Sequence, residues 1–248
     1  MLVRDGAIDV DTPTGPMRTY VYEPFEAGRA EEPVPGVVLY SEIFQQTPPI
    51  RRLAVQIAGH GHLVMVPEVY HSRLAPGTVL GYDDAGKAKG NALKVEIEVA
   101  TFDQDTDAVL RALAAHPRSN QRLGAIGFCL GGHLAFRAAR RPELRAAACV
   151  CPTDIHSHTL GKGRSDDSLA RAREIRAELL LLWGRQDPHI PAEGRRTIYD
   201  ALDAAGAHFT WHEFNAVHAY MRDEGERYDA DASQQSLRLI VDLFRRRL

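Results

Sequence analysis

Short apolar runs alternate along this chain with amphipathic stretches of helical period, and this alternation limits the possible folds more than any other feature. The apolar runs predict strands at residues 37–40, 63–66, 123–127, 146–150, 179–183 and 208–214. The stretches between them predict helices at residues 48–58, 91–115, 130–140, 192–205 and 232–247. Because strands separated by helices pair in parallel, the pattern predicts an α/β fold with a mostly parallel central sheet and helices on both faces.

The N-terminal part differs from this pattern. Two runs at residues 7–10 and 17–22 are separated by the turn sequence Thr12-Pro13-Thr14-Gly15 and predict an antiparallel strand pair. No internal repeat or low-complexity linker divides the 248 residues, so we expect one domain over residues 1–248. The connections at residues 68–90 and 152–173 are long and are candidates for pocket walls or a lid.

Composition and charge narrow the functional classes. Apolar residues make up 44% and charged residues 25% of the chain, and the formal net charge is −3. The terminal run Arg245-Arg246-Arg247 is the only block of like charge and is expected at a solvated helix end, so neither nucleic acid nor a membrane surface is an expected partner. The N-terminus lacks signal-peptide features and no apolar run reaches membrane-spanning length, which favours a cytoplasmic enzyme.

The sequence Gly127-Phe128-Cys129-Leu130-Gly131 lies where a predicted buried strand ends and a predicted helix begins. It has the spacing of the G-x-S-x-G nucleophile elbow, with cysteine in place of serine. The helix N-terminus favours a thiolate, and the amide of Leu130 would face a developing oxyanion. Cys129 is therefore the candidate nucleophile. The alternative is a small buried residue that closes a turn.

A thiolate nucleophile needs an acid–base partner, and on this scaffold the partners follow in the order nucleophile, acid, histidine. Asp187 follows the apolar run at 179–183, and His218 follows the next predicted strand. Asp187 would hold the imidazole of His218 in one tautomer, and His218 would act as base and then as acid. Taken singly, both fit ordinary turn and loop positions. Together with Cys129 they form a candidate triad.

Other chemistry-bearing residues fit weaker hypotheses. Four possible metal ligands lie within ten residues, but their C-x-C and H-x-H spacings do not match usual zinc sites, and no metal is expected: Cys149, Cys151, His156 and His158. His133 is a rival base, but its place on the helix after the elbow directs it back over that helix. The acidic run at residues 229–233 is expected to cap the last helix.

These residues resemble the dienelactone hydrolase family of α/β-hydrolases, the carboxymethylenebutenolidases, whose elbow carries cysteine. The similarity runs from about Pro35 to the C-terminal helix. Beside the elbow and the Asp187 turn, it includes Ser41-Glu42-Ile43-Phe44, Pro67-Glu68-Val69-Tyr70, Ala75-Pro76-Gly77 and His218-Ala219-Tyr220-Met221-Arg222. The resemblance implies an α/β-hydrolase fold and an activity that needs no cofactor.

The resemblance also implies roles that the spacing does not reveal. Glu42 would lie beside the nucleophile and help to keep the resting cysteine as a thiol, since a nearby carboxylate disfavours a second negative charge. The amide of Ile43 would be the second oxyanion donor beside Leu130. Arg222 would bind a substrate carboxylate, and Tyr70 would belong to the substrate site. Where the family has a second arginine, this chain has only lysines, so Lys87 and Lys89, with Lys94 nearby, are the substitutes considered.

The expected function is hydrolysis of the ester bond of a lactone or small ester through a Cys-His-Asp triad and an acyl-enzyme. The expected partner is a small, anionic ester or lactone, and the protein is expected to be a monomer or homodimer. A generic carboxylesterase or thioesterase is the nearest alternative. A thiol redox or sensor protein is disfavoured by the absence of C-x-x-C, and a non-catalytic ligand-binding scaffold by the complete triad.

Overall fold

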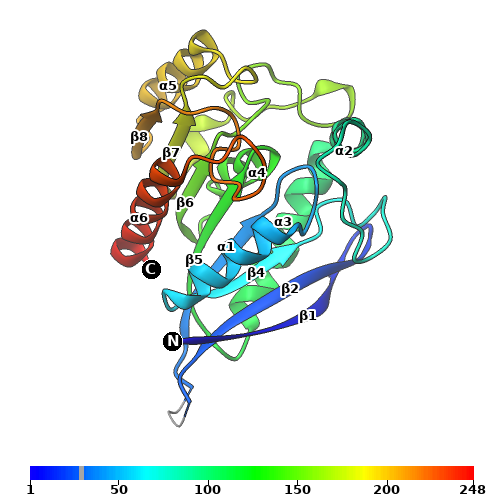
Figure 1. Cartoon of the computed structure of the whole chain (residues 1–248), viewed down its shortest axis with the longest axis vertical. Helices are drawn as coiled ribbons and strands as arrows, with labels where there is room; N and C mark the ends of the chain where they lie inside the picture. Colours follow the sequence, from blue (N-terminus) through cyan, green and yellow to red (C-terminus); the bar gives the residue numbers. More distant parts are fainter. Residues whose placement is uncertain (28–30) are drawn as a thin grey trace.

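The computed structural model describes residues 1–27 and 31–248. In these residues eight strands form one sheet, in the order β1-β2-β4-β3-β5-β6-β7-β8 (Figure 1). Their bounds are β1 (Leu2–Thr12), β2 (Gly15–Phe25), β3 (Val34–Tyr40), β4 (Leu63–Pro67), β5 (Ser119–Phe128), β6 (Leu144–Val150), β7 (Glu178–Gly184) and β8 (Phe209–Phe214). In this order, every strand from β4 across to β8 is parallel to the next one, whereas β2 is antiparallel to both β1 and β4. The predicted sheet is confirmed.

The antiparallel pair is longer than the sequence indicates. β1 and β2 pair from Leu2 opposite Phe25 to Thr12 opposite Gly15. β1 lies at the edge of the sheet and most of its residues are exposed. An exposed edge strand has no need for alternating apolar residues, so the pattern marked only its central part.

The helices are α1 (Pro48–Gly59), α2 (Asp84–Glu96), α3 (Val99–Ala115), α4 (Leu130–Ala138), α5 (Ala192–Ala205) and α6 (Ala230–Arg247), with short 3₁₀ turns η1 (Lys162–Arg164) and η2 (Ala172–Glu174). Helices α1 and α6 lie against one face of the sheet, and α3 and α4 against the other (Figure 1). The interior strands β4 and β7 are buried almost throughout, as parallel strands covered on both faces should be. No helix among the described residues is both long and apolar enough to cross a membrane.

The prediction of a single helix over residues 91–115 is wrong. Two helices occupy this region, α2 and α3, and Ile97 and Glu98 between them are extended. The carbonyls of Lys94 and Ile97, at the end of α2, accept bonds from the amides of Gly161 and Lys162 at 3.1 and 2.8 Å. Residues of the long connection after β6 thus donate hydrogen bonds to the carbonyls at the break between α2 and α3. A local sequence pattern cannot reveal such a distant partner.

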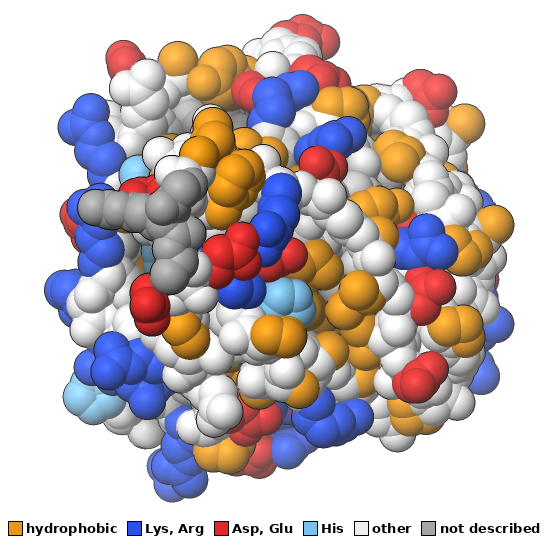
Figure 2. All heavy atoms as spheres, turned by 90° about the horizontal axis from the view of Figure 1, so that it is seen from below, with side chains coloured by type: hydrophobic (Ala, Val, Ile, Leu, Met, Phe, Trp, Pro, Cys, Tyr) orange, Lys and Arg blue, Asp and Glu red, His pale blue; other side chains and the backbone are white. Residues whose placement is uncertain are grey.

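Surface charges are largely paired rather than clustered. Arg4 and Arg118 both pair with Glu31, at 2.7 and 3.0 Å. Arg246, in the terminal basic run, pairs with Glu178 at 2.8 Å. Figure 2 shows acidic and basic side chains interspersed over one face of the molecule. Because exposed pairs of this kind contribute little stability each, the fold depends on the apolar core between the sheet and its helices.

The carboxyl ends of the parallel strands meet at one edge of the sheet, where α/β proteins usually place their sites. Cys129 follows β5, and the segments after β3, β6, β7 and β8 reach the same edge. Strand order therefore brings residues from distant parts of the sequence to Cys129.

Asp229 forms the predicted cap of α6, because its side chain accepts a hydrogen bond from the amide of Ala232 at 2.9 Å. We expect Asp229→Ala to lower the free energy of unfolding by about 1 kcal/mol, measured by urea denaturation. Asp231→Ala is the matched control, since it removes a first-turn carboxylate that makes no cap bond. Equal losses for the two variants would contradict the cap.

Candidate active site

Cys129 occupies the tight turn between β5 and α4, with φ of 55° and ψ of −118°. A positive φ is strained for a residue other than glycine and persists only where the surroundings hold it. The amide of Cys129 donates to the carbonyl of Val150 at 3.0 Å, and its carbonyl accepts from the amide of Thr153 at 3.3 Å. Backbone bonds to the end of β6 therefore hold the strained turn.

The glycines of the motif allow the backbone to approach itself closely. A Cβ at Gly127 would lie 1.9 Å from the carbonyl oxygen of Gly131. A Cβ at Gly131 would lie 2.2 Å from the carbonyl oxygen of Tyr40. Neither distance is possible between non-bonded atoms, so close packing of backbone requires both glycines.

His218 and Asp187 form a buried hydrogen-bonded pair. The Nδ1 atom of His218 lies 2.5 Å from Oδ2 of Asp187, and the amide of His189 donates to Oδ1 at 2.8 Å. Burial acts to raise the pKa of Asp187, but the hydrogen bond and charge of His218 outweigh it and lower this pKa. The carboxylate thus orients the imidazole through Nδ1 and leaves Nε2 for another partner.

The side chains of His218 and Cys129 line the same cavity. Burial acts to lower the pKa of His218, but negative charge at Cys129 and the hydrogen bond to Asp187 outweigh it and raise this pKa to about 10. The surroundings therefore favour an imidazolium beside the sulfur. The three residues of the candidate triad, which come from three separate strand ends, are neighbours in the fold.

Cys151 is a second thiol beside this pair. Its sulfur and one ligand atom each of Asp187 and His218 lie within 4.8 Å of one another. This is the one group of three possible metal ligands within residues 1–27 and 31–248. Burial, together with the charge of Asp187, raises the pKa of the Cys151 thiol, and a protonated thiol is a poor metal ligand. The four ligands considered from the sequence are not brought together.

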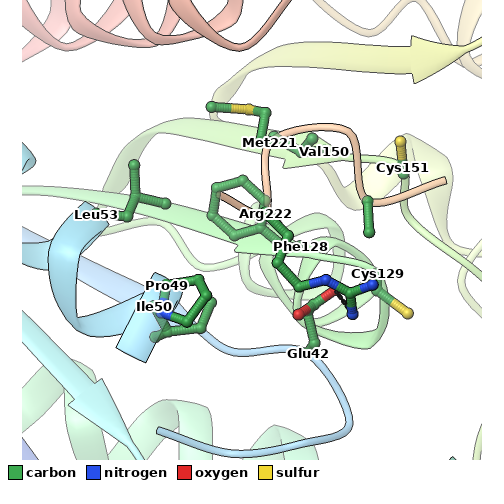
Figure 3. Close-up of a pocket in the computed structure, with 11 residues that line it drawn as sticks. Glu42, Pro49, Ile50, Leu53, Phe128, Cys129, Val150, Cys151, Met221 and Arg222 are labelled. Atoms are coloured by element: carbon green, nitrogen blue, oxygen red, sulfur yellow. Dashed lines mark ion pairs between the residues drawn. The ribbon is translucent and has the colours of Figure 1, made fainter. Parts of the chain in front are cut away.

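Glu42 follows β3 and is only 4% exposed. Burial raises the pKa of its carboxyl, against the opposing charges of Arg222, His218 and Arg227. The Nη1 atom of Arg222 lies 3.9 Å from Oε1 of Glu42, and Figure 3 shows this pair beside Cys129. Glu42, whose carboxyl was predicted to lie near the nucleophile, therefore lines the same site as Cys129.

Arg222 is held by aromatic rings as well as by charge. Its guanidinium carbon lies 4.1 Å from the ring centroid of Tyr82 and 6.0 Å from that of Phe44. Its Nε is buried without a hydrogen-bond partner among the described residues. The side chain is thus positioned by stacking, and part of its hydrogen-bonding capacity is unused.

Two recesses meet at Cys129, and both are lined by Glu42, Ala219 and Arg222. The apolar recess, in Figure 3, is lined mainly by Pro49, Ile50, Leu53, Phe128, Val150 and Met221. The polar cavity has a volume of about 390 Å³ and is also lined by Ile43, Phe44, Lys87, Asn91, Lys94, Thr153, Asp154, His156, Ser157, His189, His218 and Arg227. Residues 153–157 thus form a wall, as considered for the 152–173 connection.

Leu130 and Ile43 were expected to supply the oxyanion donors, and they lie next to Cys129 in the chain and at the polar cavity, respectively. Leu130 is the first residue of α4, so its amide has no acceptor within the helix. Ile43 lines the polar cavity, and its backbone packs against α2, where a Cβ at Gly90 would lie 2.7 Å from the Ile43 carbonyl. Tyr70 is fully buried and donates to the carbonyl of Gly90 at 3.0 Å. Tyr70 therefore supports α2 and is not among the residues that line either recess.

The lysines on α2 occupy different places. Lys87 lines the polar cavity and pairs with Asp84 at 3.1 Å. Lys94 also lines it and pairs with Asp154 at 2.9 Å. Lys89 is exposed and lines neither recess. The structure thus places Lys87 at the candidate site and leaves Lys89 outside it.

Sequence reasoning missed Thr153 and Arg227. The sulfur of Cys129 lies 3.9 Å from Oγ1 of Thr153, and the Thr153 hydroxyl donates to Asp154 at 2.9 Å. The available signal for Thr153 was its position just after a predicted strand, at the edge where the other strands end. For Arg227, inside an irregular loop, the sequence offered no such signal.

His133 lies apart from these residues. It is fully buried, with Nε2 at 2.8 Å from Oγ of Ser168 and 3.2 Å from Asp166. Arg137 joins the same group at 2.8 Å from Asp166. His133 thus belongs to a polar cluster that ties α4 to the long connection, and it lines neither recess.

Comparisons with known proteins identify a family and relatives of this chain. A family model described as "Dienelactone hydrolase family" matches residues 17–248. A "Putative carboxymethylenebutenolidase" of Saccharomyces cerevisiae is 40% identical over 256 residues, covering 100% of this chain and 93% of the relative. A "Carboxymethylenebutenolidase" of Pseudomonas putida is 27% identical over 206 residues, covering 82% of each. A crystal structure of a "Putative Dienelactone Hydrolase" from Klebsiella pneumoniae matches with a TM-score of 0.83 at 25% identity, covering 99% of each chain.

The electrostatics of the pair can be tested by ¹⁵N NMR titration of the histidine rings. We expect His218 to stay protonated well above pH 6.5, and Cys129→Ala to lower its pKa, because the charge of the sulfur is lost. Cys151→Ala is the control and should leave the pKa of His218 nearly unchanged, since it removes a neutral thiol. An unaltered pKa in Cys129→Ala would show that the sulfur is not the cause.

Proposed function

Because this chain belongs to the dienelactone hydrolase family, we propose that it hydrolyses the ester bond of a small lactone or ester that carries a carboxylate, through an acyl-enzyme on Cys129. Family membership makes the protein a hydrolase of the dienelactone hydrolase kind. One observation supports the finer proposal above all: Cys129 and His218, whose ring is bonded to Asp187, line the same cavity, which is rich in cationic side chains.

In the acylation half, the Cys129 thiolate attacks the ester carbonyl carbon and a carbon–sulfur bond forms. The carbonyl electron pair moves to oxygen, where the amides of Leu130 and Ile43 donate hydrogen bonds. When the tetrahedral intermediate collapses, the carbon–oxygen bond breaks and the His218 imidazolium gives its proton to the departing alkoxide. In a lactone the released hydroxyl stays tethered to the acyl group.

In the deacylation half, water attacks the thioester while neutral His218 takes its proton. The second tetrahedral intermediate expels the Cys129 thiolate and releases the carboxylic acid product. Asp187 holds the His218 ring through Nδ1 in both halves, so that Nε2 faces the reacting atoms. The cycle returns the enzyme to an imidazolium beside a thiolate.

Glu42 would restrain the nucleophile. Its burial beside Cys129 makes two negative charges there unfavourable, so an ionised Glu42 opposes the thiolate that the His218 imidazolium favours. A substrate carboxylate would compete with Glu42 for Arg222, which lies 3.9 Å from it. Binding of an anionic substrate would thereby release the restraint on the nucleophile.

A generic carboxylesterase is the second candidate function. The apolar recess beside Cys129 favours it, because Leu53, Phe128 and Met221 offer no partner for a charged substrate group. Preference for neutral esters would point to this alternative.

We expect Cys129→Ala and His218→Ala each to lower kcat/KM for an activated ester by at least about 10³-fold, since each removes a group that acts in the covalent steps. Cys151→Ala is the matched control and should keep most of the activity, because its buried thiol takes no part in the proposed reaction. Steady-state hydrolysis, with circular dichroism for folding, measures this. Near wild-type turnover in folded Cys129→Ala would rule out the mechanism.

The carboxylate preference can be tested with Arg222→Met on an anionic and a neutral lactone. We expect kcat/KM for the anionic lactone to fall about 10- to 100-fold, because a charge-assisted hydrogen bond is worth about 1.5–3 kcal/mol. The neutral lactone should be affected only slightly. An equal penalty on both lactones would argue against a carboxylate at Arg222.

A further inference from the structure

The polar cavity carries an excess of positive charge. Apart from the His218 imidazolium beside Cys129, four lysine and arginine side chains among the described residues line it, Lys87, Lys94, Arg222 and Arg227, against two carboxyl side chains, Glu42 and Asp154. Three of the cations have a carboxylate partner. Lys87 pairs with Asp84, Lys94 with Asp154, and Arg222 with Glu42. Arg227 has no ion pair with any residue in 1–27 or 31–248.

Two acids of the loop between β8 and α6 are paired outside the cavity. The amide of Asp229 donates to the carbonyl of Tyr220 at 3.0 Å and so closes the loop. Within the loop, Asp223 and Glu224 are bound by the guanidinium of Arg52 on α1, at distances from 2.6 to 2.9 Å. These carboxylates are held against α1, while the arginines of the same loop line the cavity.

Arg227 also lies close to the reacting groups. Its charge acts on Glu42 at one wall of the cavity and on His189 at another. The ring of His189 packs edge-on against His218, with centroids 4.7 Å apart. A guanidinium in this position, with a partly buried side chain and no internal partner, is suited to bind a planar carboxylate through two hydrogen bonds.

We propose that Arg227 binds the carboxylate of the substrate together with Arg222 and thereby sets the preference for anionic over neutral esters. The inference rests on the proposed function, since it assigns a specificity residue to that site. The paired lysines are less suited to this role, because each already has a carboxylate partner and an ammonium group lacks the planar fork.

Turnover of a matched ester pair tests the specificity. The probes are monoanionic 4-nitrophenyl adipate and neutral 4-nitrophenyl hexanoate. Arg227→Met should raise KM for the anionic ester about tenfold and change the neutral ester less than twofold. Arg227→Lys should recover part of the loss. Arg185→Met is the control, an exposed arginine at a neighbouring strand end that lines neither recess, and it should leave the ratio unchanged. Equal effects of Arg227→Met on both esters would overturn the inference.

Binding of adipate to the Cys129→Ala protein, measured by calorimetry, separates this inference from the proposed function. Adding Arg227→Met should weaken adipate binding about tenfold, and adding Arg185→Met should not. Unchanged affinity on adding Arg227→Met would overturn the inference whatever the turnover. If the wild-type protein hydrolyses neither ester while adipate binding still depends on Arg227, the proposed function fails and the anion site stands.

Discussion

The turn between β5 and α4 is packed so closely against the sheet that backbone atoms alone fill the space around it. A Cβ at Gly131 would lie 2.2 Å from the Tyr40 carbonyl of β3, and one at Gly132 would lie 2.9 Å from the Val150 carbonyl of β6. These contacts fix how far Cys129 lies from the segments that leave the ends of β3 and β6. The acid–base pair, Asp187 and His218, follows the ends of the next two strands, β7 and β8. Strand order therefore determines which side chains can meet the sulfur.

The surroundings of Glu42 and Asp187, two of the buried carboxyl groups at this edge, act on their pKa values in opposite directions. Asp187 accepts two hydrogen bonds, one from His218, and its pKa is lowered in spite of burial. Glu42 has Arg222 only at 3.9 Å, and burial dominates and raises its pKa. A buried carboxyl group can thus serve as a permanent anion that orients a base, as Asp187 does. It can also be a group whose charge depends on what enters the cavity, as for Glu42. Arg227 lines the same cavity and has no ion pair with any residue that the structure describes.

The parts of this structure that the sequence predicted are those whose signal is local. Parallel strands buried on both faces must be apolar, so β4 and β7 could be recognised from their residues. Strand ends then located Cys129, Asp187 and His218, because such ends share one edge. The break between α2 and α3 could not be predicted, since it depends on bonds from Gly161 and Lys162 far along the chain. Arg227 was missed because nothing local orients a side chain in an irregular loop.

The contrast between Cys129 and Cys151 shows what a nucleophile needs beyond a thiol at a strand end. Both follow neighbouring parallel strands and both have a positive φ, 55° and 44°. After Cys129 the chain enters α4, and the free amide of Leu130 can face an oxyanion. After Cys151 comes Pro152, which has no amide hydrogen, and burial raises the pKa of the Cys151 thiol. The next residue is the start of a helix after Cys129 and a proline after Cys151. Of the two thiols, only that of Cys129 is therefore followed by an amide that can face an oxyanion.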